Sequence, residues 1–356
     1  MNPNTFHVTI STRLFCRFLT IFSLSLISAF VFATSTTEQV FGQETLTIAT
    51  LAPERSSWDK VFKGMADEIE KKTTGRVKIK LFGSGVQGDE ELVVQKMRSG
   101  QVDGAAITGV GLSRISPNVL VFQVPGIFDG SDVDKGYREL DTVRNKMKTR
   151  LEKEFADKGF VLLGWGDVGF VYLFSTVPVK KPGDLQKVKM WQWTVDPIAK
   201  IFLEKAGANP VPLGVPDVLP NLDTGLINAY YASPLAAIAL RWFGKSKYLT
   251  AQPFSLGIGA TVVSQKSWDR LSAEDKTAVL EVADKWHKIL IKKVRADNTK
   301  SLAVLKEKGI EFVMPTDEDT RLWKQLAADT ERALVGKVYE QSILDEARKH
   351  LAAIRQ

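Results

Sequence analysis

Residues 74–103, TGRVKIKLFGSGVQGDEELVVQKMRSGQVD, decide the fold of this chain. Apolar and basic side chains alternate through residues 77–81, which predicts a strand, because neighbouring side chains of a strand face opposite sides. A glycine-rich turn follows, then a helix over residues 89–99 that Gly100 ends, and a strand over 102–108. Strands that alternate with helices at this spacing indicate an α/β fold with a largely parallel sheet.

The same patterns extend in both directions from this segment. Residues 46–50 predict a strand that a proline turn connects to a helix, and residues 133–158 predict a long helix. Further strands are predicted at 160–165, 169–175, 210–213, 226–232, 254–264 and 310–314, and further helices at 197–205, 218–223 and 235–243. Residues 273–308 contain neither Gly nor Pro, so one helix of up to about 54 Å is expected there, followed by a C-terminal helix pair that Thr316 caps.

Composition narrows the class of protein. The 356 residues are 44% hydrophobic and 25% charged, as in a folded soluble protein, and the length suggests two domains. The net charge is +7, but positive and negative residues alternate without a long basic block. We therefore expect no nucleic acid partner.

The first 42 residues differ from the rest. Arg13 and Arg17 precede an uncharged apolar run over residues 18–32, which is too short for a permanent membrane anchor and suits a secretory signal. Cleavage after Ala33 or Gly42 is possible; we favour Gly42 and expect a periplasmic protein. An uncleaved anchor is the less favoured alternative. A lipoprotein is not expected either, because Cys16 precedes the apolar run, whereas a lipid-attachment cysteine would follow it.

Removal of residues 1–42 leaves a chain without cysteine and with two histidines, His287 and His350, which lie 63 positions apart. Neither a zinc site of ordinary spacing nor a thiol enzyme can be built from these residues. No Gly-x-Ser-x-Gly motif offers a nucleophile, and both histidines fit a helix surface. We therefore expect no catalytic residues, no metal and no cofactor.

Gly83–Gly88 matches the Gly-x-Gly-x-x-Gly pattern of dinucleotide-binding turns. We interpret it as a tight turn only, because Asp89, Glu90 and Glu91 at the start of the next helix would repel a pyrophosphate. The acidic residue expected at the end of the following strand is also missing.

The segments 74–79, 88–92 and 98–103 are the first of a series of short motifs along the chain, and four more motifs follow them. They are VPGIF at 124–128, VKKPGDL at 179–185, AGA at 206–208 and LDTG at 222–225. Together they resemble the solute-binding receptors of tripartite ATP-independent periplasmic (TRAP) transporters over essentially the whole mature chain. The resemblance implies two α/β lobes, joined by hinge strands and a long lobe-spanning helix, which close on a small ligand. We assign residues 43–168 and 255–295 to lobe I, and residues 169–254 and 296–356, with the C-terminal helices, to lobe II.

In that family two arginines usually clamp a ligand carboxylate. At the corresponding positions this chain has Trp191, after the Asp-Leu segment, and Val171, after Gly169 and Phe170. Neither can replace the bidentate bonds of a guanidinium. Either the ligand lacks the carboxylate, which we prefer, or a relocated cation binds it; Arg55, Lys187 and Lys189 are the candidates for that cation.

Aromatic residues dominate the expected cleft. Trp191 and Trp193 are two positions apart in an extended segment and should share a face, while Trp58 and Trp165 fit better as packing residues. Tyr231 and Ser233 lie where the family places a polar ligand contact. The candidate ligand-binding residues are Trp191, Trp193, Phe170, Val171, Tyr231, Ser233, Thr108, Glu54 and Arg55.

The resulting hypothesis is a periplasmic receptor, expected to be monomeric, that delivers an apolar or aromatic solute to a TRAP membrane permease. An organic-acid receptor with a relocated cation is the alternative within this class. A secreted α/β enzyme is the alternative of another class. It lacks support, because we find no nucleophile and base in the sequence.

Overall fold

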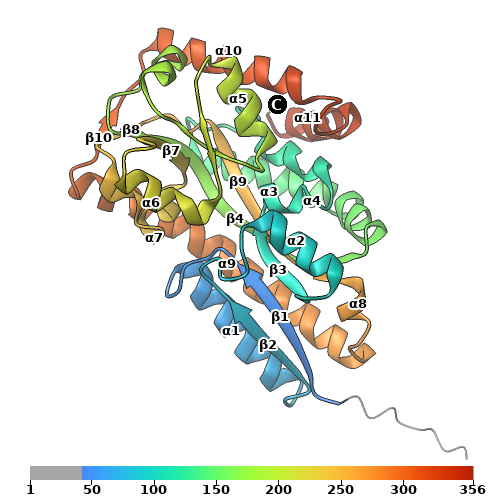
Figure 1. The fold of residues 1–356 in the computed structure, drawn as a ribbon. Coiled ribbons are helices and arrows are strands. Elements are labelled where there is room, and N and C mark those ends of the chain that lie inside the picture. The colour runs from blue at the N-terminus through green and yellow to red at the C-terminus, as the bar shows by residue number, and fades with distance from the viewer. Residues whose placement is uncertain (1–41, 356) are drawn as a thin grey trace, which may run out of the picture. The chain divides into compact units, whose positions relative to one another are not determined.

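The computed structural model describes residues 42–355 (Figure 1). The predicted signal segment therefore lies outside the described residues, apart from Gly42. The strands are β1 (Glu44–Thr50), β2 (Val77–Phe82), β3 (Gly104–Thr108), β4 (Phe160–Ser175), β5 (Trp191–Trp193), β6 (Val211–Leu213), β7 (Ala229–Ala232), β8 (Tyr248–Thr250), β9 (Ser255–Ser264) and β10 (Glu311–Val313). The α-helices are α1 (Ser57–Lys72), α2 (Glu90–Ser99), α3 (Gly109–Leu112), α4 (Val133–Asp157), α5 (Pro197–Lys205), α6 (Val218–Asp223), α7 (Pro234–Ala239), α8 (Gln265–Trp268), α9 (Ala273–Glu307), α10 (Asp317–Leu334) and α11 (Gln341–Arg355).

The main sheet has the strand order β10-β8-β4-β9-β3-β1-β2, and β7 also pairs with β4. β1 is parallel to β2 and β3, as the strand–helix alternation predicts. The expectation of a largely parallel sheet is nevertheless wrong, because β9 runs antiparallel to both β3 and β4, and β4 runs antiparallel to β7 and β8. β9 returns to the sheet about 150 residues after β3, and local sequence patterns carry no signal for its direction.

β4 crosses the molecule as one strand of 16 residues, where the sequence predicted two strands separated by glycines. Its pairing with β9 shifts register between Leu162 and Gly164 and again between Asp167 and Gly169. At these two irregularities, next to Gly164 and Gly169, the register changes but the strand continues. The last part of β4 pairs with β7 and β8, so this strand connects the two ends of the sheet.

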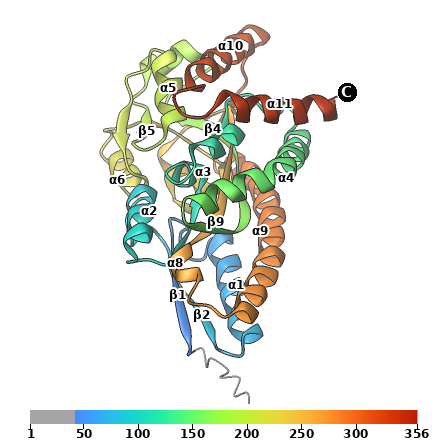
Figure 2. The same ribbon diagram turned by 90° about the vertical axis from the view of Figure 1, so that its right-hand side faces the viewer.

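The long helix predicted after Ser272 is confirmed. α9 has 35 residues, about 52 Å at 1.5 Å per residue, and the Ser272 hydroxyl accepts a bond from the backbone N–H of Asp275 at its start. It packs against α1, α7 and β4, and Figure 2 shows it beside α1. The helix thereby contacts the middle of β4, from Gly164 to Gly169. None of the helices within residues 42–355 is both long and apolar enough to cross a membrane.

Asn298 on α9 fixes the second irregularity of β4. Its amide group donates to the backbone carbonyls of Val168 and Val294, both at 3.0 Å, and its oxygen accepts from the N–H of Leu235 at 3.0 Å. Gly169 makes room for this side chain: its φ is +109°, and a Cβ there would lie 2.4 Å from the Asn298 nitrogen.

We therefore expect Gly169→Ala to lower the free energy of unfolding by about 2–4 kcal/mol, from backbone strain and overpacking together. Gly309→Ala is the matched control, because Gly309 also has a positive φ, +86°, but open space around its Cβ position. For Gly309→Ala we expect the free energy of unfolding to fall by only about 1 kcal/mol, from the positive φ alone. Chemical denaturation of both variants gives the comparison, and equal losses would contradict the role of Asn298.

Candidate functional site

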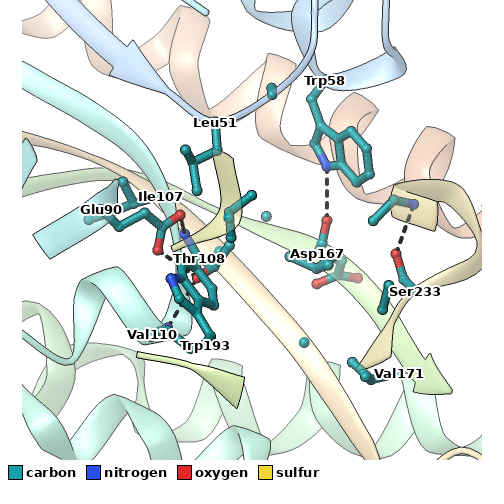
Figure 3. A pocket seen from close by; sticks show the side chains of 18 of the residues that line it. Leu51, Trp58, Glu90, Ile107, Thr108, Val110, Asp167, Val171, Trp193 and Ser233 are labelled. Carbon is teal, nitrogen blue, oxygen red and sulfur yellow. Dashed lines mark hydrogen bonds between the residues drawn. The ribbon is translucent and has the colours of Figure 1, made fainter. Parts of the chain in front are cut away.

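A cavity of about 210 Å³ lies where β4 and β9 meet the segments around them (Figure 3). Its wall comes from the β1–α1 connection with α1, from the end of β3, from the middle of β4, from β5, from β7 with α7, from β9 and from α9. Segments far apart in sequence therefore converge on one space.

The structure places six of the nine candidate residues on this wall. They are Trp191, Trp193, Val171, Tyr231, Ser233 and Thr108. Phe170 points to the opposite side of β4 from Val171, as strand alternation requires, and packs on Tyr137 with ring centroids 5.2 Å apart. Glu54 and Arg55 are exposed and lie outside the wall, so their expected placement at the site is wrong.

Trp191 and Trp193 lie on one face of β5, as expected, with ring centroids 6.4 Å apart and nearly parallel planes. Tyr231 stacks on Trp191 at 4.7 Å, and Trp242 meets Trp191 edge-on at 5.2 Å. The polar atoms of Trp191 and Tyr231 are already bound: the Trp191 indole N–H donates to the carbonyl of Leu213 at 3.0 Å, and the Tyr231 hydroxyl hydrogen-bonds to Asp196 at 3.1 Å. This aromatic wall therefore presents mainly carbon to the cavity.

Trp58 also lines the cavity, so its interpretation as a simple packing residue is wrong. It comes from the apolar face of α1, and its indole N–H donates to the backbone carbonyl of Asp167 at 3.3 Å (Figure 3). Phe254, next to the start of β9, forms another part of the wall. The helical periodicity places Trp58 on an apolar face but cannot distinguish a core from a cavity.

Glu90 is the main polar residue that sequence reasoning missed. Its side chain is 1% exposed and accepts three bonds, from the N–H and the hydroxyl of Thr108 at 2.8 and 2.7 Å and from the N–H of Gly111 at 2.9 Å. Burial raises its pKa to about 7 despite these donors. In the sequence it stands among three acidic residues at a helix start, and nothing there distinguishes it from its neighbours.

Asp167 and Asp196 are the other carboxyl groups on the wall. Asp196 caps α5 by accepting from the N–H groups of Ile198 and Ala199 at 2.9 and 3.0 Å, and burial raises its pKa. Asp167 is paired with Arg144 at 2.7 Å and with Arg295 at 2.6 Å. All three carboxyl groups thus have partners within the protein.

Among the residues from 42 to 355 that line the cavity, none is lysine or arginine. The three cations considered as replacements for the family arginines lie elsewhere. Lys187 pairs with Asp184 at 2.7 Å, the ammonium of Lys189 donates to the carbonyl of Gly225 at 3.2 Å, and Arg55 is exposed. The described part of the chain also contains no group of three or more His, Cys, Asp or Glu side chains positioned to hold a metal ion.

His287 is buried on the wall, so the expectation that it lies on a helix surface is wrong. Its Nδ1 lies 2.7 Å from the carbonyl of Ala283, which can only accept, so Nδ1 carries the hydrogen. Nε2 then accepts from the Thr261 hydroxyl at 2.8 Å, and burial lowers the pKa of the ring to about 4. Gly164 on β4 leaves the space for this ring, since a Cβ there would lie 2.4 Å from it.

Comparison with known proteins agrees with this architecture. The model of the family described as bacterial extracellular solute-binding protein, family 7, matches residues 48–337. The 2,3-diketo-L-gulonate-binding periplasmic protein YiaO of Escherichia coli strain K12 is 26% identical over 256 residues, which cover 70% of this chain and 75% of that protein.

Solved structures show the same fold. A TRAP periplasmic solute-binding protein from Ralstonia eutropha H16, with bound (S)-2-acetolactate, superimposes with a TM-score of 0.80 at 19% identity and covers 87% of this chain and 99% of that chain. One from Citrobacter koseri, with bound D-glucuronate, has a TM-score of 0.76 at 23% identity and covers 86% of this chain and 99% of that chain. The predicted two-lobed α/β fold is thereby confirmed.

The buried neutral His287 makes folding stability depend on pH. Its folded pKa of about 4 lies below the ordinary 6.5, so as the pH falls from 6.5 to 4 the unfolded chain binds a proton that the folded chain does not. We expect the wild type to lose up to about 3 kcal/mol relative to His287→Gln over this range, at 1.36 kcal/mol per unit. Thermal or chemical unfolding of both proteins at several pH values measures this difference.

Two controls isolate this effect. Glu90 has the opposite dependence, since its raised pKa gives stability at low pH that is lost as the pH rises through about 7. Both proteins contain Glu90, so the difference between them reports His287 alone. His350→Gln, on α11 and outside the cavity wall, controls for the general effect of replacing a histidine by glutamine. Parallel curves for wild type and His287→Gln would contradict the prediction.

Proposed function

Because the chain belongs to bacterial extracellular solute-binding protein family 7, we propose that it captures a small organic solute in the 210 Å³ cavity and delivers it to a TRAP-type membrane permease. The family consists of periplasmic receptors rather than enzymes. The cavity supports this role, because it is a single space at the convergence of the segments that surround the crossover strands.

The solute of this proposal is uncharged and apolar or aromatic. The observation that carries it is the lack of any lysine or arginine among the described residues that line the cavity. Carbon faces of Trp191, Trp193 and Tyr231 form one wall instead. An apolar cavity of roughly 150 Å³ holds benzene, so the space here suits a substituted single ring or a branched chain of similar size.

An anionic solute would meet an unfavourable site. Desolvating a carboxylate without a paired cation costs several kcal/mol, whereas each buried CH₂ contributes only about 0.8 kcal/mol. Glu90 adds to this cost, because a carboxyl group whose pKa is about 7 is partly ionised at neutral pH and repels an anion.

A receptor for a sugar acid or another organic acid is the second candidate. The solved relatives from Ralstonia eutropha and Citrobacter koseri hold such acids, which favours it. For this chain it would require Arg55, Lys187 or Lys189 to reach the cavity, and Lys187 and Lys189 are bound to other groups. We therefore prefer the uncharged solute.

The proposal also covers the ligand contacts, the lobe boundaries and the oligomeric state. Thr108, Val171, Trp191, Trp193, Tyr231 and Ser233 are the proposed ligand contacts. The lobe boundaries at 168/169, 254/255 and 295/296 stay predictions. A crossover within β4 is supported by its pairing, which changes from β9 to β7 after Val171. Closure of the lobes about these crossovers, and a monomeric state, complete the proposal.

Export through a signal at residues 1–42 is tested by the mass of the secreted protein. We expect the exported chain to begin at Gln43, or at Thr34 if the alternative site is cleaved, because these positions follow the apolar run. Intact-mass measurement of the periplasmic fraction distinguishes the two. A full-length chain that stays in the membrane would contradict export.

Calorimetric titration tests the solute class. We expect neutral aromatic solutes such as 4-methylphenol and indole to bind, and D-glucuronate and succinate not to bind at millimolar concentration. Trp191→Phe should weaken binding of the neutral solutes by about 1–2 kcal/mol, or roughly 5- to 30-fold, through lost apolar contact.

Trp268→Phe is the matched control, since Trp268 is also buried but lies outside the cavity, and it should leave affinity unchanged. Native mass spectrometry of the freshly purified protein would also reveal a solute retained from the cell. Micromolar binding of D-glucuronate or succinate that survives Trp191→Phe would overturn the proposed class and favour the acid receptor.

A further inference from the structure

Asp89 binds three separate segments at the edge of the cavity. One carboxylate oxygen, Oδ1, accepts from the N–H of Glu90 at 2.8 Å and so caps α2. The other oxygen, Oδ2, accepts from the indole N–H of Trp193 at 2.8 Å and from the backbone N–H of Val215 at 3.2 Å. Gly214 allows this approach, because a Cβ there would lie 2.9 Å from Oδ2.

These partners belong to different sides of the cavity. α2, which Asp89 caps, packs against β3, α3 and β9. Trp193 lies on β5, which packs against β6, β7 and α5. The carboxylate therefore joins the part of the wall that holds Glu90 and Thr108 to the part that holds the aromatic stack.

A second contact crosses between the same regions. Arg114, which follows α3, donates from Nη2 to the carbonyl of Val195 at 2.9 Å, two residues after Trp193. The end of β5 and the segment after it are thus each held at one point by the α2–α3 region. Only the Asp89 contact reaches a side chain that lines the cavity.

We infer that Asp89 is a positioning residue, which orients the Trp193 indole on the cavity wall and joins the two sides of the cavity. This rests on the proposed function only in taking the cavity as the solute site. Without the bond, the backbone of β5 would still hold Trp193 in place, but no acceptor would fix the plane of its ring. A bond to a carboxylate is stronger than one to a neutral acceptor. Asp89 is only half-buried, so water can replace its partners when the two sides separate.

Two variants remove this bond in different ways. Trp193→Phe keeps an aromatic ring but has no N–H to donate. Asp89→Asn keeps the helix cap, because Asn caps as well as Asp. With its oxygen on the cap, however, its NH₂ group faces the two donors from Trp193 and Val215 and cannot accept from them. The matched control is Asp132→Asn, since Asp132 caps α4 through the N–H of Lys135 and makes no such crossing contact.

The experiment uses the purified protein without added solute, labelled with 5-fluorotryptophan. Eight tryptophans give the ¹⁹F spectrum, and the resonance absent from Trp193→Phe is that of Trp193. We expect this resonance to shift by more than its line width in Asp89→Asn and to stay in place in Asp132→Asn. X-ray scattering should show a larger radius of gyration for both Asp89→Asn and Trp193→Phe than for the control.

An unchanged Trp193 resonance in Asp89→Asn would overturn the inference, as would radii of gyration equal to that of the control in both variants. If Asp89→Asn does not fold, Trp193→Phe still decides by scattering, because it leaves the cap of α2 intact. No solute is used, so the result does not depend on the proposed solute class. A receptor that binds D-glucuronate could still show the Asp89 effect, and a receptor for neutral solutes could lack it.

Discussion

The crossover strand depends on Asp167, whose fully buried carboxylate binds two arginines from two different helices. Arg144 comes from α4 and Arg295 from α9, and Asp141 pairs with both of them. The four charges balance, whereas loss of one partner of such a buried group usually costs about 3–5 kcal/mol. Because Trp58 of α1 also bonds to the Asp167 carbonyl, four elements meet at this one residue of β4.

The same network influences the chemistry of the cavity. Asp167 lies on the cavity wall, and the two arginines directly behind it are bound to carboxylates of the protein. Arg295 also stacks over the ring of Tyr137 at 4.3 Å. The guanidinium groups of Arg144 and Arg295 therefore contribute to the fold. Their positive charges are compensated by the carboxylates of Asp141 and Asp167, with which they form ion pairs.

Much of the fold follows from local sequence. The missing Gly and Pro after Ser272 predicted α9, and alternation in residues 190–193 placed Trp191 and Trp193 on one face. The failures have a common cause, which is a partner distant in sequence. The direction of β9 depends on strands about 100 and 150 residues away. His287 and Glu90 are buried because Gly164 and Gly111, on other elements, leave space for them. A glycine in one strand cannot be matched to a histidine over 100 positions later without the fold.

The proposed solute class rests on the side chains of the cavity wall rather than on the fold. The structure from Ralstonia eutropha keeps the fold at a TM-score of 0.80 with only 19% identity, so the fold is compatible with very different side chains. In this chain Trp191 donates to Leu213, Trp193 donates to Asp89, and Tyr231 bonds to Asp196. Once these polar atoms are satisfied within the protein, the wall offers carbon surface and little hydrogen bonding. Under the proposed function, such a wall would discriminate between solutes by size and apolar area, because a buried polar group without a partner is strongly disfavoured.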